Sequence, residues 1–246
     1  MKKFIAAGLA LCMAFMLAAC GASPSSTASQ AGSGTSAAAD GSAVTIKLGG
    51  IGPITGSTAV YGEAVMNGAQ IAVDEINASD SAVKFEYNFQ DDEGDAETAV
   101  NAYNILKDWG MQVLMGTVTT APCLAVISET EADNMFQITP SASSTDVIVP
   151  DNVFQVCFTD PNQGVSAADY IADNGLATKV AAIYDSSDAY SSGIYNAFAA
   201  EAEAKGLEIV CAEAFTADNK TDFRTQLQKA QSAGADLVFL PIYYQE

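Results

Sequence analysis

Short β-branched runs alternate with longer amphipathic segments from Val44 to the end of the chain. This alternation is typical of parallel sheets whose faces are covered by helices. The chain is therefore predicted to be an α/β protein with parallel sheets.

The period of the apolar residues places the individual elements. Strands are predicted at 44–51, 83–89, 112–115, 136–138, 153–158, 179–184, 207–212 and 237–240. Helices are predicted at 63–78, 95–109, 121–134, 162–174, 190–205 and 221–233, with Asp95 as the N-cap of the second helix and Gly110 as its stop. Because the βα series starts again near residues 159–163, we expect an N-terminal lobe at 44–160 and a partial C-terminal lobe at 161–246.

The first 19 residues have the order of a cleaved secretion signal. Lys2 and Lys3 precede an apolar run from Phe4 to Met16, and small residues lead to Cys20. The run is shorter than the roughly 20 residues that a helix needs to cross a bilayer. Cleavage before Cys20 is predicted, which places the mature protein outside the cytoplasm. An ordinary secretion signal that is cleaved elsewhere is the alternative.

The segment Leu17-Ala18-Ala19-Cys20 resembles the lipobox of bacterial lipoproteins, which implies a diacylglyceryl group on the Cys20 thiol. Two acyl chains anchor a protein stably, whereas one chain holds it only marginally. Residues 20–43 are mostly Gly, Ala, Ser and Thr, and such a segment buries too little surface to offset the entropy of ordering. We expect a flexible tether to the bacterial cell membrane; a modified or partner-binding segment is the alternative.

Composition disfavours several classes of function. The formal net charge is −20, and loss of Lys2 and Lys3 with the leader makes it −22, which disfavours nucleic acid and anionic lipid as partners. The sequence has no histidine, so Ser-His-Asp catalysis and imidazole metal sites are excluded. The cysteines of the folded part are far apart in sequence and odd in number, which favours buried free thiols and leaves one disulfide open as the alternative. They are Cys123, Cys157 and Cys211.

Three short motifs resemble known signatures but fit them poorly. The glycines within 50–56 follow the first strand, yet the third is one place late for a dinucleotide site and Pro53 lacks the N–H that a phosphate would use. Residues 91–95 are acidic without the ligand spacing of a calcium loop, and capping of the next helix explains them. Ser81 and Lys84 would not share a helical face. No catalytic residue, metal or cofactor is expected.

Hydroxyl and aromatic side chains gather just after the predicted strands. The carboxyl ends of parallel strands form one rim at which ligands bind, so we expect these side chains to share a cleft. Thr119 and Thr120 would lie at a helix N-terminus, where hydroxyls and free N–H groups suit a carboxylate. Turn chemistry is the alternative for each Ser or Thr taken singly. The rim residues are Tyr61, Thr117, Thr119, Thr120, Ser141, Ser143, Ser144, Tyr190, Tyr243 and Tyr244.

Several separated segments together resemble the leucine/isoleucine/valine-binding protein family, the substrate-binding components of ABC-type importers. The resemblance covers Val44 to Glu246 and implies a type I periplasmic-binding-protein fold, in which two Rossmann-like lobes joined by crossovers close on a ligand. The segments are Gly52–Gly56 with Tyr61-Gly62, Gly68-Ala69 with Asp74–Asn77, Asp91-Asp92, Ile138–Ser143, Asp160–Gly164, Tyr184-Asp185 with Tyr190, Thr221–Phe223 and Tyr243–Glu246.

The resemblance also implies roles within an amino-acid site. Thr120 matches a position that holds the ligand carboxylate, while Ser141 and Ser143 match positions whose backbone carbonyl and hydroxyl meet the ammonium group. Three tyrosines match aromatic positions of the pocket walls. The predicted ligand-binding residues are Tyr61, Thr119, Thr120, Ser141, Ala142, Ser143, Tyr190 and Tyr243.

The end of the chain bears on how complete this site is. The last residues follow a predicted strand with no closing helix, and the family's acidic partner for the ligand ammonium would lie beyond Glu246. We therefore expect a C-terminally truncated chain with an incomplete site.

These features favour a binding protein without enzymatic activity. We expect it to capture an amino acid, of branched-chain type, or a similar small polar solute and to present it to an ABC permease, with closure of the lobes set by the ligand. A sensing module that feeds a receptor is the alternative. An enzyme on a doubly wound fold is a third class, because fold alone does not fix function.

Overall fold

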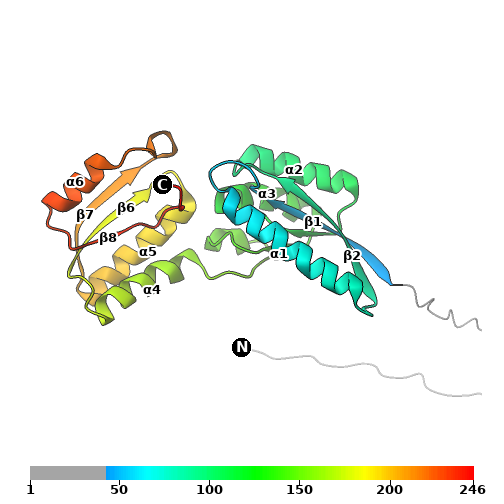
Figure 1. Cartoon of the computed structure of the whole chain (residues 1–246), viewed down its shortest axis with the longest axis horizontal. Helices are drawn as coiled ribbons and strands as arrows, with labels where there is room; N and C mark the ends of the chain where they lie inside the picture. The colour runs from blue at the N-terminus through cyan, green and yellow to red at the C-terminus, as the bar shows by residue number, and fades with distance from the viewer. Residues whose placement is uncertain (1–42) are drawn as a thin grey trace, which may run out of the picture. The chain divides into compact units, whose positions relative to one another are not determined.

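The computed structural model describes residues 43–246, and Figure 1 shows the course of the chain. Each strand and helix that the periodicity predicts is present, so the α/β fold class is confirmed. In chain order the elements are β1 Val44–Gly52, α1 Ala59–Ala78, β2 Val83–Asp91, α2 Ala96–Trp109, β3 Val113–Met115, α3 Thr120–Asp133, β4 Gln137–Thr139, β5 Val153–Gln155, α4 Asp160–Asp173, β6 Lys179–Asp185, α5 Ala189–Lys205, β7 Glu208–Phe215, α6 Arg224–Ser232 and β8 Leu237–Phe239, with 3-10 helices at Thr145–Ile148 and Ala217–Asn219.

The strands form two sheets, and each strand runs parallel to its neighbours. The first has the order β2-β1-β3-β4-β5 and the second the order β7-β6-β8. In Figure 1, α1 covers one face of the first sheet and α2 and α3 cover the other; α4 and α5 lie on one side of the second sheet and α6 on the other. The predicted lobe boundary at residues 160 and 161 falls at the start of α4, between the sheets, and stays a prediction.

Each sheet has its own apolar core. Ala99, Tyr103 and Leu106 recur at spacings of three and four along α2, so they share one helical face and pack on Ile51 of β1 and Leu114 of β3. The second core joins α4 and α5 to β6, with Ile171, Val180 and Phe198 among its buried members. The helical periodicity in the sequence thus corresponds to the faces that are buried.

The predicted ends of α2 are confirmed. The Asp95 carboxylate accepts a hydrogen bond from the Thr98 N–H at 2.8 Å, and Gly110 ends the helix in the left-handed region at φ 89°. Asp188 caps α5 in the same way, since its carboxylate accepts from the Ser191 N–H at 3.3 Å.

Helix α1 begins four residues before its predicted start, at Ala59 instead of Glu63. Gly62 lies inside the first turn of α1. A Cβ there would lie 1.7 Å from the Pro53 carbonyl oxygen, so the glycine permits close packing of α1 on the loop after β1. Tyr61 is therefore held by a helix and not by a loop.

Helix α6 begins three residues later than predicted, at Arg224. The Asp222 carboxylate accepts from the Arg224 N–H at 3.1 Å and forms an ion pair with the Arg224 guanidinium, which holds residues 221–223 outside the helix. Strand β5 is also shorter than predicted, because only residues 153–155 pair with β4.

The three cysteines of the described chain are unpaired, as the sequence favours. Cys123 is fully buried on α3, where burial raises the pKa of its thiol to about 11. Cys157 and Cys211 are only half-buried, so the expected burial holds for one thiol of the three.

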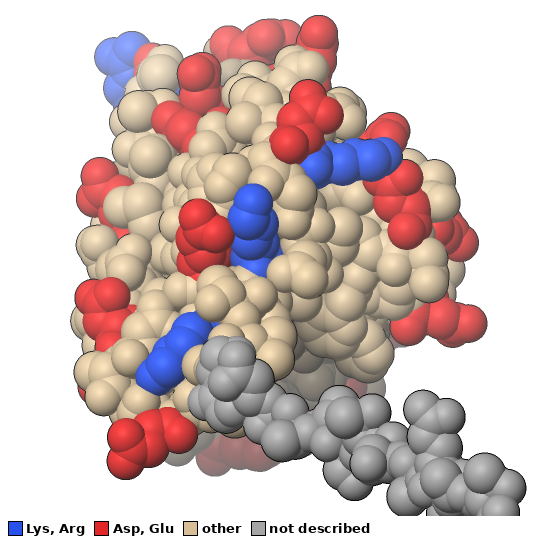
Figure 2. Space-filling model, turned by 90° about the vertical axis from the view of Figure 1, so that its right-hand side faces the viewer, with Lys and Arg blue, Asp and Glu red and all other residues tan. Residues whose placement is uncertain are grey.

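The surface of the described residues is acidic with interspersed basic groups. On the face drawn in Figure 2, Lys and Arg side chains lie beside Asp and Glu, separated by uncharged areas. Pairs of this kind include Lys107 with Asp133 and Lys205 with Asp169, the latter at 2.7 Å. None of the helices within residues 43–246 is both long and apolar enough to cross a membrane.

The contact between α4 and α5 yields a stability prediction. A Cβ on Gly164 of α4 would lie 2.4 Å from the Ile194 carbonyl oxygen and 2.6 Å from the Phe198 nitrogen on α5. We expect Gly164→Ala to force the helices apart and lower the free energy of unfolding by about 2 kcal/mol. Urea unfolding followed by circular dichroism measures this change.

Gly68→Ala is the matched control, because nothing lies within 4 Å of a Cβ at this exposed position in α1. There the substitution removes only backbone freedom, and we expect it to stabilise the protein by roughly 0.5–1 kcal/mol. Equal stability of the Gly164→Ala variant and the unsubstituted protein would contradict the close helix contact.

Candidate functional site

The predicted site residues meet at one small cavity at the carboxyl ends of the strands. The cavity has a volume of about 60 Å³. Seven of the eight predicted ligand-binding residues line it, and Val118 is the additional member. The lining residues are Tyr61, Val118, Thr119, Thr120, Ser141, Ser143, Tyr190 and Tyr243.

The N-terminus of α3 supplies the polar wall of this cavity. Thr119 and Thr120 are buried, and neither hydroxyl has a hydrogen-bond partner within the protein. Thr119 is the N-cap residue, yet its side chain makes no capping bond. The first N–H groups of a helix also have no intrahelical partner, and Pro122 contributes none. Two hydroxyls and the N–H groups of Thr120 and Ala121 are therefore available at the positive end of the helix dipole.

A buried hydrogen-bonded network supports this helix end from behind. Gln137 of β4 donates from Nε2 to the Gly116 carbonyl at 2.7 Å and accepts from the Thr130 hydroxyl at 2.7 Å. The Thr139 hydroxyl donates to the Thr117 carbonyl at 2.7 Å. All these polar groups are satisfied, so the loop between β3 and α3 is fixed before any ligand binds.

Three tyrosines from distant parts of the sequence form the aromatic wall. The rings of Tyr190 and Tyr243 stack with centroids 4.8 Å apart, and Tyr61 meets Tyr243 at 5.7 Å. The Tyr61 hydroxyl accepts a hydrogen bond from the Tyr244 N–H at 3.2 Å. Burial raises the pKa of Tyr190 to about 12 and that of Tyr243 well above its ordinary value, so both phenols are neutral donors at physiological pH.

The loop after β4 brings Ser141 and Ser143 to the cavity but not Ala142. The Ala142 N–H donates to the Thr139 hydroxyl at 3.0 Å, and its carbonyl accepts from Gln155 Nε2 at 2.6 Å. Both backbone groups of Ala142 are therefore engaged in holding the loop. Ala142 stays a predicted site residue for which the geometry shows only a supporting position.

Three further rim residues lie away from this cavity. Thr117 belongs to the buried network, since its hydroxyl donates to the Thr119 carbonyl at 3.1 Å. The Ser144 hydroxyl accepts from the Asp146 N–H at 3.2 Å and caps a 3-10 helix. Tyr244 is exposed and stands next to Tyr61. Thr117 and Ser144 therefore follow the alternative given above, in which a loop hydroxyl bonds the local backbone and not a ligand.

Asp91 fixes the loop after β1, a role that sequence reasoning missed. Its carboxylate accepts from the Ile54 N–H and the Glu93 N–H, each at 2.9 Å, and from the Thr55 hydroxyl at 2.6 Å. Capping was the expected role of the acidic segment 91–95, and only Asp95 has it. The pairing of the ends of β1 and β2 is what brings Asp91 to this loop.

Asp160 is a buried acid close to the site that sequence reasoning left without a role. Its N–H donates to the Ser143 carbonyl at 2.9 Å, and its Oδ2 has no partner. Burial, reinforced by repulsion from Asp188, raises its carboxyl pKa to about 6. The negative charge of Asp160 also contributes to the raised pKa values of Tyr190 and Tyr243. Its position two residues after the predicted strand 153–158, at the same rim as the other site residues, is the sequence signal that could have found it.

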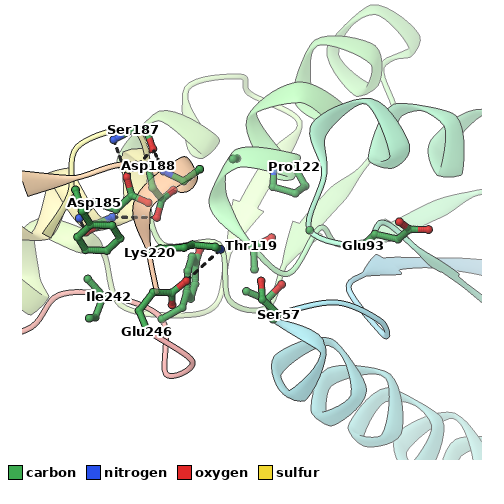
Figure 3. A pocket seen from close by; sticks show the side chains of 17 residues that line it. Ser57, Glu93, Thr119, Pro122, Asp185, Ser187, Asp188, Lys220, Ile242 and Glu246 are labelled. Atoms are coloured by element: carbon green, nitrogen blue, oxygen red, sulfur yellow. Dashed lines mark hydrogen bonds and ion pairs between the residues drawn. The ribbon is translucent and has the colours of Figure 1, made fainter. Parts of the chain in front are cut away.

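A second cavity of about 220 Å³ adjoins the first, with which it shares Thr119 and Tyr243. Figure 3 shows that Asp185, Asp188, Lys220 and Glu246 gather at one end, while Ser57 lies near Thr119. Within residues 43–246, no group of three or more His, Cys, Asp or Glu side chains could hold a metal ion. The two cavities together offer space and polar groups for a small organic solute.

Comparison with known proteins identifies the family. Residues 45–243 match the periplasmic binding protein family. The chain belongs to this family. The family resemblance inferred from the sequence is thereby confirmed.

Individual relatives within this family agree with the fold. The chain is 33% identical over 205 residues to the Leu/Ile/Val-binding protein homolog 3 of Brucella melitensis, covering 82% of this chain and 55% of that relative. It is 30% identical to the branched-chain amino acid transporter substrate-binding protein LivJ of Streptococcus pneumoniae, solved in complex with isoleucine, with a TM-score of 0.75 over 81% of this chain and 57% of that one. The leucine-binding protein LivK of Thermotoga maritima gives a TM-score of 0.73 at 27% identity, covering 79% of this chain and 55% of that one. The chain thus spans about half the length of these relatives.

Asp92, next to the loop that Asp91 fixes, yields a pH prediction. It is fully buried with an unpartnered Oδ2, and burial, reinforced by repulsion from Asp91 and Asp95, raises its carboxyl pKa from 3.8 to about 7. Because the folded pKa lies above the unfolded one, the stability that this group contributes is lost as the pH rises from about 4 through about 7. The Asp92→Asn variant has no carboxyl group to ionise here. As the pH rises through this window, its free energy of unfolding should therefore increase by about 2–4 kcal/mol relative to that of the unsubstituted protein.

Urea unfolding at several pH values between 4 and 8 measures the difference between the two proteins. Asp151→Asn, at an exposed carboxylate, is the control and should leave the pH profile unchanged. Parallel profiles for the Asp92→Asn variant and the unsubstituted protein would contradict the raised pKa.

Proposed function

We propose that the protein is the solute-binding component of an ABC importer and that it captures an α-amino acid at the cavity lined by Thr119, Thr120 and the three tyrosines. The unpartnered hydroxyls at the N-terminus of α3 carry this proposal. Removing a polar group from water without a partner costs about 1–3 kcal/mol, and a bound carboxylate would recover that cost at both threonines.

The rest of the cavity suits the ammonium group of the same ligand. The lining contributes the oxygen atoms of Ser141 and Ser143 and the faces of the tyrosine rings, all of which attract a cation. Asp160 adds negative potential from its buried position beside Ser143. In this proposal Asp160 supplies part of the acidic character that the sequence led us to expect only beyond Glu246.

The relatives support this class of ligand. Their names describe binding of leucine, isoleucine and valine, and a further relative from Pseudomonas aeruginosa, 28% identical over 206 residues, is a leucine-, isoleucine-, valine-, threonine- and alanine-binding protein. Their shared ligand feature is an α-amino acid backbone. Proteins of this type bind without chemical turnover, so we propose a binder rather than an enzyme, with an ABC permease as its partner.

The proposed location is outside the cytoplasm, anchored by lipid on Cys20. Cys20 and the tether up to residue 42 lie outside the described residues, so the sequence order of charge, apolar run and Leu-Ala-Ala-Cys is the support for it. Anchoring would keep the binding protein close to its permease.

The carboxylate role of α3 is tested with Thr120→Val, which removes one hydroxyl while retaining the shape of the side chain. A hydrogen bond to a charged group contributes about 1.5–3 kcal/mol, so we expect amino-acid affinity to fall by roughly 10–100-fold. Isothermal titration against the twenty amino acids measures this loss. Because the hydroxyl has no partner in the fold, the melting temperature of the variant should not fall.

Thr139→Val is the contrasting variant. Its hydroxyl bonds both the Thr117 carbonyl and the Ala142 N–H, so its loss should lower the melting temperature. Failure of the unsubstituted protein to bind any of the twenty amino acids would refute an amino-acid binder.

Lipidation is tested by growing bacteria that express the full chain with labelled palmitate. We expect label on the full chain and none on a Cys20→Ser variant, which should also leave the membrane fraction. Cys12→Ser is the control, since Cys12 lies within the predicted leader and its substitution should retain the label. Equal labelling of both variants would contradict acylation at Cys20.

A further inference from the structure

The second cavity differs in chemistry from the first. Its inner end carries three carboxylates, those of Asp185, Asp188 and Glu246, and one ammonium group, that of Lys220. Lys220 pairs with Glu246 at 3.1 Å. Glu93 also lines the cavity, but its carboxylate points away in Figure 3. Two carboxylates at this end are therefore without a counter-ion.

The cluster has a second feature that points to a ligand. The Glu246 side chain is only 7% exposed, and its Oε2 has no hydrogen-bond partner although its Oε1 meets Lys220. At the junction with the first cavity, the buried Thr119 hydroxyl is likewise unpartnered. Unsatisfied acceptors that face a cavity are the groups that a donor-rich ligand would satisfy.

The carboxylates also repel one another. Burial raises the pKa of Asp188, and the charges of Asp185 and Glu246 raise it further, against hydrogen bonds from the Ser191 and Tyr190 N–H groups. A positive charge placed among them would relieve this repulsion. An aliphatic side chain there would instead leave the Asp185 and Asp188 carboxylates without a counter-ion.

We propose that the second cavity receives a basic side chain, so that the ligand is an α-amino acid with a terminal amine or guanidinium group. This inference rests on the proposed function, because the ligand carboxylate at α3 directs its side chain past Thr119 and Tyr243 into the second cavity. It departs from the branched-chain ligands in the relatives' names, and the acidic end of the cavity is the reason.

The test compares lysine with norleucine, which has the same carbon chain without the terminal amine. Isothermal titration of the full chain should show lysine binding at least tenfold more tightly, with the ratio falling as sodium chloride rises from 0.05 to 0.5 M because salt screens the charges. Asp188→Asn should lower the ratio, because it removes one of the two carboxylates without a counter-ion. Asparagine is as good an N-cap as aspartate, so α5 should remain capped, and thermal melting checks the fold.

Asp151→Asn is the matched control, because it removes the same charge at an exposed position outside both cavities and should keep the ratio. Norleucine or leucine binding as tightly as lysine would overturn the basic side chain and leave the proposed function standing. Glutamine binding more tightly than lysine would overturn it in favour of a neutral donor. Absence of binding to any α-amino acid would overturn both proposals.

Discussion

The parallel direction of the strands determines where this protein can hold a ligand. In the sheet β2-β1-β3-β4-β5 the chain passes to opposite sides of β1, and in β7-β6-β8 it does the same around β6. The loops after β1 and β3 therefore separate at one point, and those after β6 and β8 separate at another, which leaves a crevice beyond the strand ends. Tyr61, Thr119, Tyr190 and Tyr243 follow these four strands and line one cavity.

Within this frame, the polar groups near α3 divide into satisfied and unsatisfied ones. Gln137, Thr139 and Thr117 complete their hydrogen bonds inside the protein, whereas the hydroxyls of Thr119 and Thr120 complete none. Buried hydroxyls normally find partners, and these two neighbouring exceptions lie at the positive end of a helix, which is the basis for proposing a carboxylate there. The hydrogen bonds of Gln137, Thr139 and Thr117 hold the loop that carries the Thr119 and Thr120 hydroxyls.

The sequence predicted those features that depend on local pattern. The spacing of apolar residues predicted the helices and strands, and the ends of the predicted strands indicated the rim of the sheet. Seven of the eight predicted site residues line the cavity at this rim. Features that depend on tertiary neighbours were not predictable. The close packing of Gly62 on Pro53 depends on the loop after β1, and Asp91 is expected to be part of a cap until the pairing of β1 with β2 is known. Gln137 reads as an ordinary strand residue, because its partners, Thr130 and Gly116, lie on other segments.

The two adjoining cavities have helix-end donors on one side and carboxylates on the other, and in the proposed function this difference bears on selectivity. The end of α3 offers hydroxyl and N–H donors with the positive pole of a helix dipole, while Asp160, Asp185 and Asp188 place negative charge on the side of α4, β6 and α5. A zwitterion with its carboxylate at α3 is therefore oriented by the field before side-chain packing acts on it. Packing of apolar groups separates ligands by only about 1–3 kcal/mol per methylene, whereas an uncompensated buried charge is more costly. If the proposed function holds, discrimination at this site would depend first on the charge of the ligand side chain and only then on its shape.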